Sequence, residues 1–318
     1  MNQEPTDFER NRTMMALRAH QRGGPEQLIY EEAPKPVPGP DEVLIAVRAA
    51  AITLAELTWP ETWTAEGVDR TPVIPSHEFA GVVAEGGANV QEFVAGDSVF
   101  GLVPFDRDGA AAEFLTVPAA CVAKKGPLVP DVTAAAAVLP ALTAWEALID
   151  QADLRPGQRI LIRGGAGAVG SFLTQFAKAM GAEVTATVRS ASAVGRTKSL
   201  GADHVITTGH SLDIPRVSGF DVVVDAVGAD VPEWMYAAPR PGGHLIVLQE
   251  PPNQELAAKY GVTATFFIVR TRRDRLQQLA ARIANDEVEV AAGLMFPLAS
   301  GRAAYEAKPS GKTVLTVE

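Results

Sequence analysis

The stretch that decides the fold is Arg159-Ile160-Leu161-Ile162-Arg163-Gly164, followed by Gly165-Ala166-Gly167-Ala168-Val169-Gly170. It reads as a short apolar strand, a G-x-G-x-x-G turn and a helix that continues over residues 171–180. The first glycine permits the tight turn, the second lets the backbone approach a pyrophosphate, and the third lets helix pack on strand. The helix start offers free N–H groups and its positive dipole end to the phosphates. An ordinary turn without a ligand is the alternative, but this context favours dinucleotide binding.

Strand-like and helix-like runs alternate after this turn. Further strands are expected at residues 183–188, 221–225, 244–248 and 263–269, and a helix at 192–200. Strands that alternate with helices of about ten residues predict a parallel sheet with helices on both faces. An alanine-rich stretch before the turn, residues 133–150, is expected to be helical and interrupted at Pro140. Residues 132–270 are therefore expected to form a doubly wound α/β domain of the Rossmann type.

The end of the second strand of this domain indicates which dinucleotide binds. NAD sites usually carry an acidic residue about 20 positions beyond the glycines, bonded to the ribose 2′-hydroxyl. This chain has Thr187-Val188-Arg189-Ser190 there instead. Arg189 can pair with a 2′-phosphate and Ser190 can donate a second hydrogen bond. These residues favour NADPH as the cofactor, with a solvated loop charge at Arg189 as the alternative.

The chain before residue 131 has a different texture. Short β-like runs lie at residues 15–20, 43–51, 78–84 and 114–117, separated by turns. Four prolines at residues 33–40 exclude a helix there and indicate an extended connection. We expect a mobile tail at residues 1–13 and a compact β domain at residues 14–131. The segment 271–318, with a short helix and a final strand, is expected to rejoin that domain.

The composition excludes several classes of protein. The chain has 318 residues, of which 47% are hydrophobic and 21% charged, so it is long enough for about two globular domains. A net charge of −10 disfavours a general binder of nucleic acid or acidic membranes. The single cysteine, Cys121, excludes an intramolecular disulfide. No signal peptide is visible and the longest apolar run, residues 134–145, contains Pro140, so we expect a soluble, cytoplasmic protein.

Several motifs together resemble the medium-chain dehydrogenase/reductase superfamily, in its zinc-independent NADPH:quinone oxidoreductase-like branch. They are PSHEFAGVV at residues 75–83, FVAGDSV at 93–99, LPALTAW at 139–145, the glycine turn at 165–170 and GKTVL at 311–315. The resemblance covers essentially the chain from Met14 to its end. It implies a GroES-like β-barrel catalytic domain beside the Rossmann domain, with the active site in the cleft between them. It also implies that Thr143 and Phe267 contact the cofactor.

The same resemblance raises the question of zinc. In the zinc alcohol dehydrogenases of the superfamily, the motif that is Ser76-His77-Glu78 here supplies a metal-binding histidine. Catalytic zinc usually has three protein ligands. The cysteine ligands of the zinc enzymes would fall near residues 51–53 and 142–143, where this chain has no cysteine. A lone histidine without such partners is more often structural, so we expect no metal.

The catalytic groups are inferred from the resemblance alone. In Thr53-Leu54-Ala55-Glu56, Thr53 stands at the family's polar residue near the nicotinamide and Glu56 at its acid. Trp59 and Trp63 follow, and they either lie beside a flat substrate or pack in the core. No tyrosine is near this loop in the sequence, so water or a hydroxyl such as that of Thr53 is the expected proton donor.

These residues lead to one expected activity and two alternatives. The expected activity is NADPH-dependent hydride transfer to a quinone or conjugated enone without a metal, because such acceptors delocalise the charge that arrives. An enoyl reductase acting on a biosynthetic intermediate and a non-catalytic NADPH-binding redox sensor are the alternatives. A homodimer is also expected, because residues 263–269 resemble the sheet-edge segment through which family members join, and an exposed apolar edge favours pairing.

Overall fold

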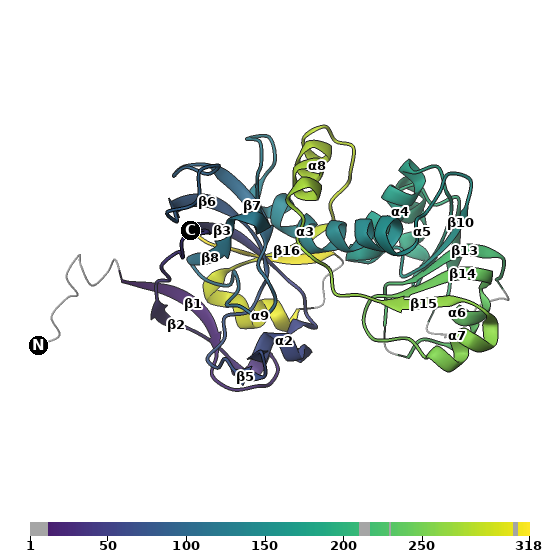
Figure 1. Cartoon of the computed structure of the whole chain (residues 1–318), viewed down its shortest axis with the longest axis horizontal. Coiled ribbons are helices and arrows are strands. Elements are labelled where there is room, and N and C mark those ends of the chain that lie inside the picture. Colours follow the sequence, from purple (N-terminus) through teal and green to yellow (C-terminus); the bar gives the residue numbers. More distant parts are fainter. Residues whose placement is uncertain (1–11, 210–216, 229, 308–310) are drawn as a thin grey trace, which may run out of the picture. The chain divides into compact units, whose positions relative to one another are not determined.

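The computed structural model describes residues 12–209, 217–228, 230–307 and 311–318. Of the expected tail at residues 1–13, only Arg12 and Thr13 are among them, and Thr13 already begins a strand. The described chain divides into two compact units. The first runs to Val138 and resumes at Thr271, and the second is Leu139–Arg270. Figure 1 shows both units.

The second unit is built on a six-stranded parallel sheet. Its strands are β10 (Arg159–Arg163), β11 (Glu183–Val188), β12 (His204–Thr207), β13 (Phe220–Asp225), β14 (Pro239–Val247) and β15 (Thr263–Phe266). They stand in the order β12-β11-β10-β13-β14-β15. Counted from β10 this is 3-2-1-4-5-6, the doubly wound arrangement of dinucleotide-binding domains. The predicted α/β fold is confirmed, although the sequence pattern missed β12.

Short helices connect these strands. They are α4 (Ala168–Ala179), η5 (Ala191–Ala193), α5 (Val194–Ser199), α6 (Glu233–Ala237) and α7 (Gln254–Tyr260). Figure 1 shows α4 and α5 on one side of the sheet and α6 and α7 on the other. One apolar cluster fills the space between α6, α7 and the sheet, with Leu161, Val223 and Met235 at its centre. This packing on both faces explains why the strands are apolar along their whole length.

The helix before the sheet differs from the expectation. α3 (Asp131–Trp145) contains Pro140 without ending there and continues into a π-helical segment, η4 (Glu146–Gln151). The expected interruption at Pro140 is wrong, because the neighbouring residues are buried and packing outweighs one lost backbone hydrogen bond. The 21-residue stretch Asp131–Gln151 is long and apolar enough to cross a membrane, but 67% of its apolar window is buried, as in a core helix.

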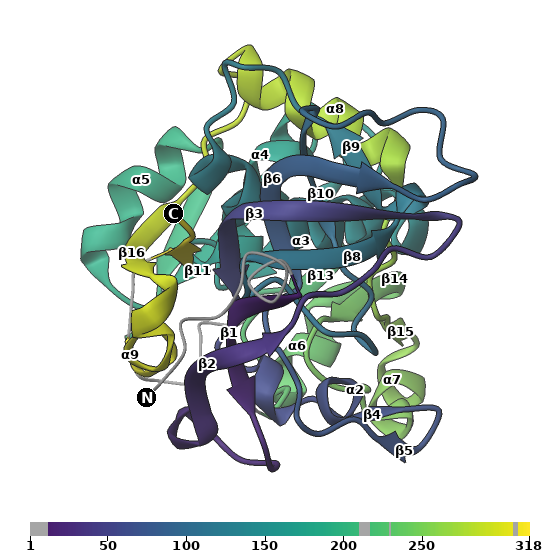
Figure 2. The ribbon, with the colours of Figure 1, turned by 90° about the vertical axis from the view of Figure 1, so that its left-hand side faces the viewer.

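The first unit is built on a seven-stranded sheet in the order β16-β17-β3-β6-β7-β9, with β8 also paired to β3. Its strands are β3 (Glu42–Ile52), β6 (Glu78–Gly86), β7 (Ser98–Leu102), β8 (Phe114–Pro118), β9 (Val122–Lys124), β16 (Ala292–Pro297) and β17 (Lys312–Thr316). Every pair is antiparallel except β16 with β17. Figure 2 shows β3 running across this unit beside β6 and β8. The proline-rich residues 33–40 contain no helix, as expected: Ala33 and Pro34 end β2, residues 35–39 have no regular structure, and Pro40 begins a turn into β3.

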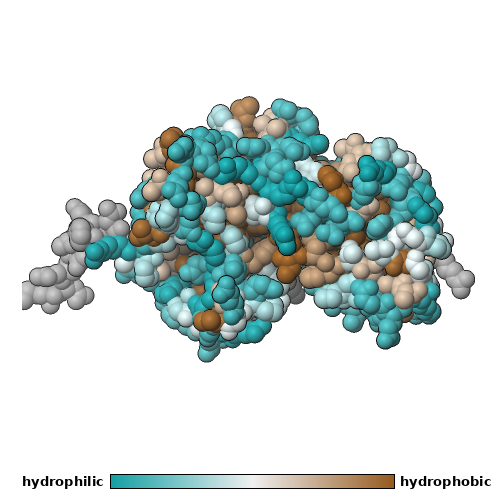
Figure 3. Space-filling model, viewed as in Figure 1, coloured by the Kyte–Doolittle hydropathy of each residue, from teal (hydrophilic) through white to brown (hydrophobic). Residues whose placement is uncertain are grey.

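Smaller elements surround this sheet. They are the hairpin β1 (Thr13–Ala19) and β2 (Leu28–Pro34), the pair β4 (Thr64–Ala65) and β5 (Val68–Asp69), the helices α2 (Pro60–Trp63), α8 (Arg273–Ala284) and α9 (Gly301–Glu306), and the 3-10 turns η1 (Pro25–Gln27), η2 (Glu56–Thr58), η3 (Ala119–Cys121) and η6 (Leu298–Ser300). A single apolar core joins residues of the hairpin, the sheet and α9. On the face drawn in Figure 3 hydrophilic residues predominate and apolar residues are scattered among them.

The C-terminal segment completes the sheet of the first unit. β17 lies between β16 and β3, and its register places Thr313 opposite Ile52. On the other side of β3, Ala51 is opposite Glu78 of β6. Residues far apart in the chain therefore meet at the end of β3.

Gly170 provides a test of the glycine turn. A Cβ atom added there would lie 2.1 Å from the carbonyl oxygen of Gly164, a backbone atom that cannot turn aside. We expect Gly170→Ala to lower the free energy of unfolding by about 1–3 kcal/mol, the usual cost of overpacking. Gly195→Ala on α5 is the matched control, because its Cβ meets open space, and it should be neutral or stabilising. Equal urea midpoints for the two variants would contradict the expected contact.

Candidate functional site

Three strands of the first unit end or begin at one place. β3 ends at Ile52, β6 begins at Glu78 and β17 begins at Lys312. Because β3 pairs antiparallel with both β6 and β17, these strand ends lie side by side. Thr53, the first residue after β3, therefore meets the first residues of the other two strands.

The side chains at this junction form a connected polar cluster. Lys312 Nζ donates a hydrogen bond to Thr53 Oγ1 at 2.5 Å and lies 2.5 Å from Glu78 Oε1. The Thr53 hydroxyl donates a long hydrogen bond, 3.5 Å, to the same carboxylate oxygen. Lys312 and Glu78 are buried, whereas Thr53 is half-buried. A hydroxyl group thus stands at the accessible side of a buried ammonium–carboxylate pair.

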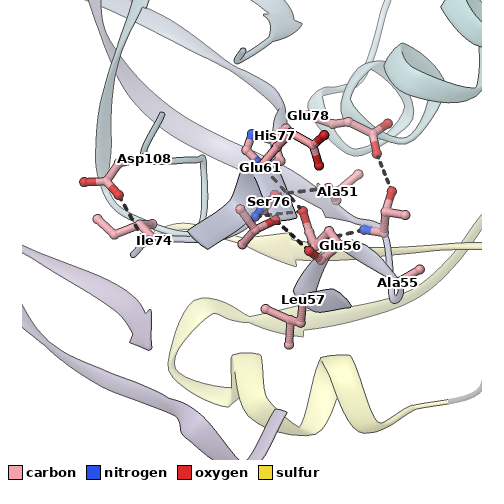
Figure 4. Close-up of polar contacts among 12 residues, drawn as sticks. Ala51, Ala55, Glu56, Leu57, Glu61, Ile74, Ser76, His77, Glu78 and Asp108 are labelled. Carbon is pink, nitrogen blue, oxygen red and sulfur yellow. Dashed lines mark hydrogen bonds and ion pairs between the residues drawn. The ribbon is translucent and has the colours of Figure 1, made fainter. Parts of the chain in front are cut away.

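Glu56 lies inside the loop that follows Thr53. Its Oε1 accepts hydrogen bonds from the Thr53 backbone N–H at 3.2 Å and from the Tyr305 hydroxyl at 2.5 Å. Its Oε2 accepts from the Ser76 N–H at 3.1 Å. Figure 4 shows Glu56 next to Ser76 and His77. Glu56 is 1% exposed and accepts from the backbone of Thr53, so it is placed to support that loop, and its expected catalytic role stays a prediction.

Burial changes how these groups ionise. Loss of hydration raises the pKa of Glu56 to about 7, although the Tyr305 hydroxyl and the charge of Lys312 oppose the shift. Burial, followed by the nearby charge of Glu56, raises the pKa of Tyr305 well above its ordinary value. The two groups therefore share one short hydrogen bond in which Tyr305 keeps its proton.

Ser76 adopts a backbone conformation that is rare for a residue with a side chain. Its φ angle is 69°, in the left-handed region. Its N–H donates to Glu56 and its hydroxyl donates to the Ala51 carbonyl oxygen at 3.0 Å. Surrounding contacts hold this strained residue, as is common at functional sites. The turn directs His77 and Glu78 to the same end of β3.

His77 is buried, and neither of its ring nitrogens has a hydrogen-bond partner of normal geometry among the described residues. Burial, and then the charge of Arg70, lowers its pKa to about 3, so the imidazole is neutral. Its Nε2 lies 4.0 Å from Glu56 Oε2, and its ring contacts the edge of Phe105 at 5.0 Å between centroids. His77 therefore packs as a neutral ring behind the cluster.

The donors at this site do not fit a catalytic zinc ion, which takes three ligands of cysteine, histidine or carboxylate type. Within residues 12–209, 217–228, 230–307 and 311–318, no three His, Cys, Asp or Glu side chains are grouped to hold a metal. Thr53 and Glu78 already contact the ammonium group of Lys312. An ammonium group is the cation that these side chains hold.

The two tryptophans of the following loop occupy different environments. Trp63 is 2% exposed in the apolar core, and its indole N–H donates to the Leu57 carbonyl oxygen at 3.0 Å. The expectation that Trp63 lines a substrate pocket is therefore wrong, because its ring is enclosed by protein. Trp59 is half-buried and packs edge-on against Phe105 at 5.4 Å. Trp59 alone keeps a face toward the surface.

Sequence reasoning missed three members of this site. In the sequence Glu78 and Lys312 stand only within family motifs, and Tyr305 is far from the loop. Tyr305 is 249 positions from Glu56, and Lys312 is 259 positions from Thr53. The pairing of β17 with β3 brings Lys312 to Thr53, and α9 carries Tyr305 to Glu56; no local pattern signals either contact.

The second unit carries the glycine turn between β10 and α4. Gly164 has a φ of +89°, which favours glycine, and its N–H donates to the Thr187 hydroxyl at 3.2 Å. Gly167 caps α4 with no side-chain hydrogen bond. The first N–H groups of a helix have no acceptor within the helix, so those of residues 168–170 can bind an anionic group such as a phosphate. The turn Gly165-Ala166-Gly167-Ala168-Val169-Gly170 therefore fits a dinucleotide.

A buried ion pair fixes the neighbouring strand ends. Arg163 at the end of β10 donates to Asp225 at the end of β13 at 2.9 Å, and Asp225 is fully buried. The other carboxylate oxygen of Asp225 accepts from the Val227 N–H at 2.9 Å and the Gly228 N–H at 3.3 Å. One carboxylate thus holds β10, β13 and the turn after β13.

The other expected cofactor residues are spread over this unit. Arg189 and Ser190 are exposed directly after β11. Ser190 Oγ accepts from the Ser192 N–H at 3.2 Å and begins η5. Thr143 is 9% exposed within α3, and Phe267 is half-buried just beyond β15. Their contacts with a cofactor stay predictions.

The buried carboxyl group of Glu56 predicts a pH effect on stability. Its pKa is 4.5 in its ordinary state and about 7 here, so the stability from this shift is present below pH 4.5 and is lost as the pH rises through 7. Glu56→Gln removes the ionisation. Between these pH values the wild type should lose up to about 3 kcal/mol relative to E56Q. Urea unfolding at a series of pH values measures this, and parallel curves would contradict it.

Two family models match the chain. The model for the alcohol dehydrogenase GroES-like domain matches residues 39–130, and the model for zinc-binding dehydrogenase matches residues 168–273. The first lies within the unit built on β3 and the second begins at α4 and covers most of the parallel sheet. The expected combination of a GroES-like domain with a Rossmann sheet is therefore confirmed.

Individual relatives agree with these models. A zinc-type alcohol dehydrogenase-like protein of Schizosaccharomyces pombe is 31% identical over 69% of this chain and 67% of its own length. A trans-enoyl reductase of Aspergillus terreus is 36% identical over 63% of this chain and 59% of its own. The solved structure of the quinone oxidoreductase from Coxiella burnetii has a TM-score of 0.87 at 25% identity, covering 96% of this chain and all of that one. The chain therefore belongs to the medium-chain dehydrogenase/reductase superfamily of oxidoreductases, which act with a nicotinamide cofactor.

Proposed function

We propose that the protein is an NADPH-dependent reductase of quinones or conjugated enones that works without a metal. The observation that carries the proposal is the hydroxyl group of Thr53, bonded to the ammonium group of Lys312. By the resemblance, a cysteine ligand of the zinc enzymes would fall near residues 51–53. The likeness to a quinone oxidoreductase structure supports the same class of acceptor. A simple ketone needs a metal or a strong acid to stabilise the alkoxide, whereas quinones and enones spread the charge over several atoms.

In this proposal the second unit binds the cofactor and the loop after β3 binds the acceptor. NADPH supplies a hydride to the acceptor when it is bound. The N-terminus of α4 holds its phosphates and Arg189 holds the 2′-phosphate, with help from Ser190. Thr53 donates a hydrogen bond to the acceptor oxygen, and Glu56 fixes the backbone of Thr53. Trp59 offers an accessible ring against which a flat acceptor can stack.

The activity is tested by following NADPH absorbance with a panel of quinones, enones and simple ketones, with and without a chelator. We expect oxidation of NADPH with the conjugated acceptors alone, unchanged by the chelator, and no stoichiometric zinc by elemental analysis. Bound zinc, together with activity lost to the chelator, would refute metal independence. Tight NADPH binding without turnover on any acceptor would favour the redox-sensor alternative.

A trans-enoyl reductase that works on a biosynthetic intermediate is the second candidate. The 36% identity to such an enzyme from Aspergillus terreus favours it. The two candidates share the hydride transfer and differ in the acceptor. Turnover of enoyl thioesters but not of quinones in the same panel would select the second candidate.

Cofactor choice is tested at Arg189. We expect the wild type to bind NADPH more tightly than NADH, and Arg189→Ala to weaken NADPH by about 1.5–3 kcal/mol while leaving NADH unchanged, because a charge-assisted bond to the 2′-phosphate is lost. Arg155→Ala is the matched control, since Arg155 is an exposed arginine before the opposite end of β10. Calorimetric titration measures both cofactors. Equal affinities of the wild type for NADPH and NADH would contradict the proposal.

We also propose a cytoplasmic homodimer. β15 is the edge strand of the parallel sheet, and Ile268 just beyond it is 50% exposed. An unpaired edge with an apolar neighbour favours pairing with a second copy. Light scattering should therefore give the mass of a dimer, and Ile268→Lys should shift it toward the monomer. A wild-type monomer at working concentration would contradict the pairing.

A further inference from the structure

We propose that Lys312, held by Glu78, is a built-in cation that strengthens the hydroxyl group of Thr53 as a donor to an oxyanion. The inference rests on the proposed function and deepens it, because it names the group that stabilises the negative charge left on the acceptor oxygen after hydride arrives. Thr53 is the catalytic residue in this arrangement. Lys312 and Glu78 are positioning residues that act through it.

The donors and acceptors around Thr53 indicate that Lys312 donates to Thr53 and that Thr53 in turn donates to a ligand. A hydroxyl group has one donor hydrogen, whereas an ammonium group has only donors. Lys312 must therefore donate to Thr53 Oγ1, over 2.5 Å, and the Thr53 hydrogen points elsewhere. The Thr53 hydroxyl donates instead to Glu78 Oε1 over 3.5 Å, a long and therefore weak hydrogen bond. An oxyanion at a normal hydrogen-bond distance would displace this weak acceptor, and donation from an ammonium group to the Thr53 oxygen makes its hydroxyl a better donor.

Burial distinguishes this ion pair from a surface one. Lys312 is 7% exposed and Glu78 is 1% exposed, so both groups have lost most of their hydration. A buried ion pair seldom adds net stability, because desolvation offsets the attraction. In return, a charge in a site that excludes water acts more strongly on a nearby oxyanion. Such an arrangement suits the stabilisation of charge on a ligand.

Another buried lysine of the same unit offers a contrast. Lys125 is 9% exposed and pairs with Asp131 at 2.9 Å, like Lys312 with Glu78. Lys125 also donates to the Val129 carbonyl oxygen at 2.7 Å, which has no hydrogen to donate to a ligand. Lys125 therefore links two segments of backbone. Lys312 instead ends on a hydroxyl group that is half-buried, so the two lysines form a matched pair for experiment.

The ligand class follows from the chemistry. A quinone that accepts a hydride becomes a hydroquinone monoanion, and an enone becomes an enolate; each then takes one proton from water. A phenolate resembles both, since its charge lies on an oxygen conjugated to a flat system. A nitrophenol is therefore a suitable probe, because its neutral and ionised forms absorb light differently and no cofactor is needed.

The experiment compares nitrophenol binding to the full-length protein and its variants across pH, without NADPH. We expect the wild type to prefer the phenolate form at least tenfold over the phenol. Lys312→Met should remove that preference, Lys312→Arg should restore most of it, and Lys125→Met should behave as the wild type. If the wild type shows no preference, or if K312M and K125M behave alike, the inference is overturned.

A second variant keeps the test decisive if K312M does not fold. Thr53→Val removes the hydroxyl group and leaves the ion pair intact, so it should lose the phenolate preference, and Thr53→Ser should restore it. With an active acceptor, T53V and K312M should lower kcat at least tenfold at an unchanged KM for NADPH. Absence of turnover in the wild type would refute the proposed function alone, because the phenolate preference is measured independently. A phenolate preference that survives in T53V would overturn the inference.

Discussion

The pairing of β17 with β3 is the constraint on which the candidate site depends. It places Lys312 beside the end of β3, where Thr53 begins the loop. The pairing of β3 with β6 brings Glu78 to the same point from the other side. Strand registers change only in steps of a whole residue, and a slip of one residue turns every side chain to the opposite face of the sheet. The alignment of ammonium, carboxylate and hydroxyl groups is therefore set by the backbone.

Glu56 adds a second level of control within the same unit. Its carboxyl group gathers the N–H of Thr53, the N–H of Ser76 and the hydroxyl of Tyr305, which come from three separate segments. Such a group is costly to bury, and its raised pKa shows that cost. Because Glu56 accepts hydrogen bonds from all three, the loop keeps one shape, while the Thr53 hydroxyl has only a long hydrogen bond to Glu78 as a donor. Rigid support beneath an accessible group is the usual design of a catalytic site.

The sequence predicted the fold well and the site in part. The turn Gly165–Gly170 has strong local requirements, so the doubly wound sheet follows from it and is confirmed. The sequence did not predict β12 because this strand, His204–Thr207, has only four residues. Its two end residues are exposed and its two central residues are half-buried, so it shows no apolar alternation. The prediction of an interruption at Pro140 was wrong because the burial of α3 outweighs the local tendency of proline to end a helix. Trp59 and Trp63 look alike in sequence, and only the packing of the loop separates a core ring from an accessible one. NADPH preference, metal independence and dimer formation stay predictions.

The position of β17 also affects the order in which the chain acquires its structure. β17 lies inside its sheet, between β16 and β3, whereas the unit Leu139–Arg270 is an uninterrupted stretch of chain. The parallel sheet can therefore fold on the ribosome as soon as it emerges, because domains generally fold as units during synthesis. In the other unit β8 covers only residues 42–46 on that side of β3, so residues 49–52 have no strand partner there until β17 appears. An incomplete sheet exposes an unpaired strand edge that can pair with another chain. β17 therefore both assembles the site and covers a strand edge through which the nascent chain could aggregate.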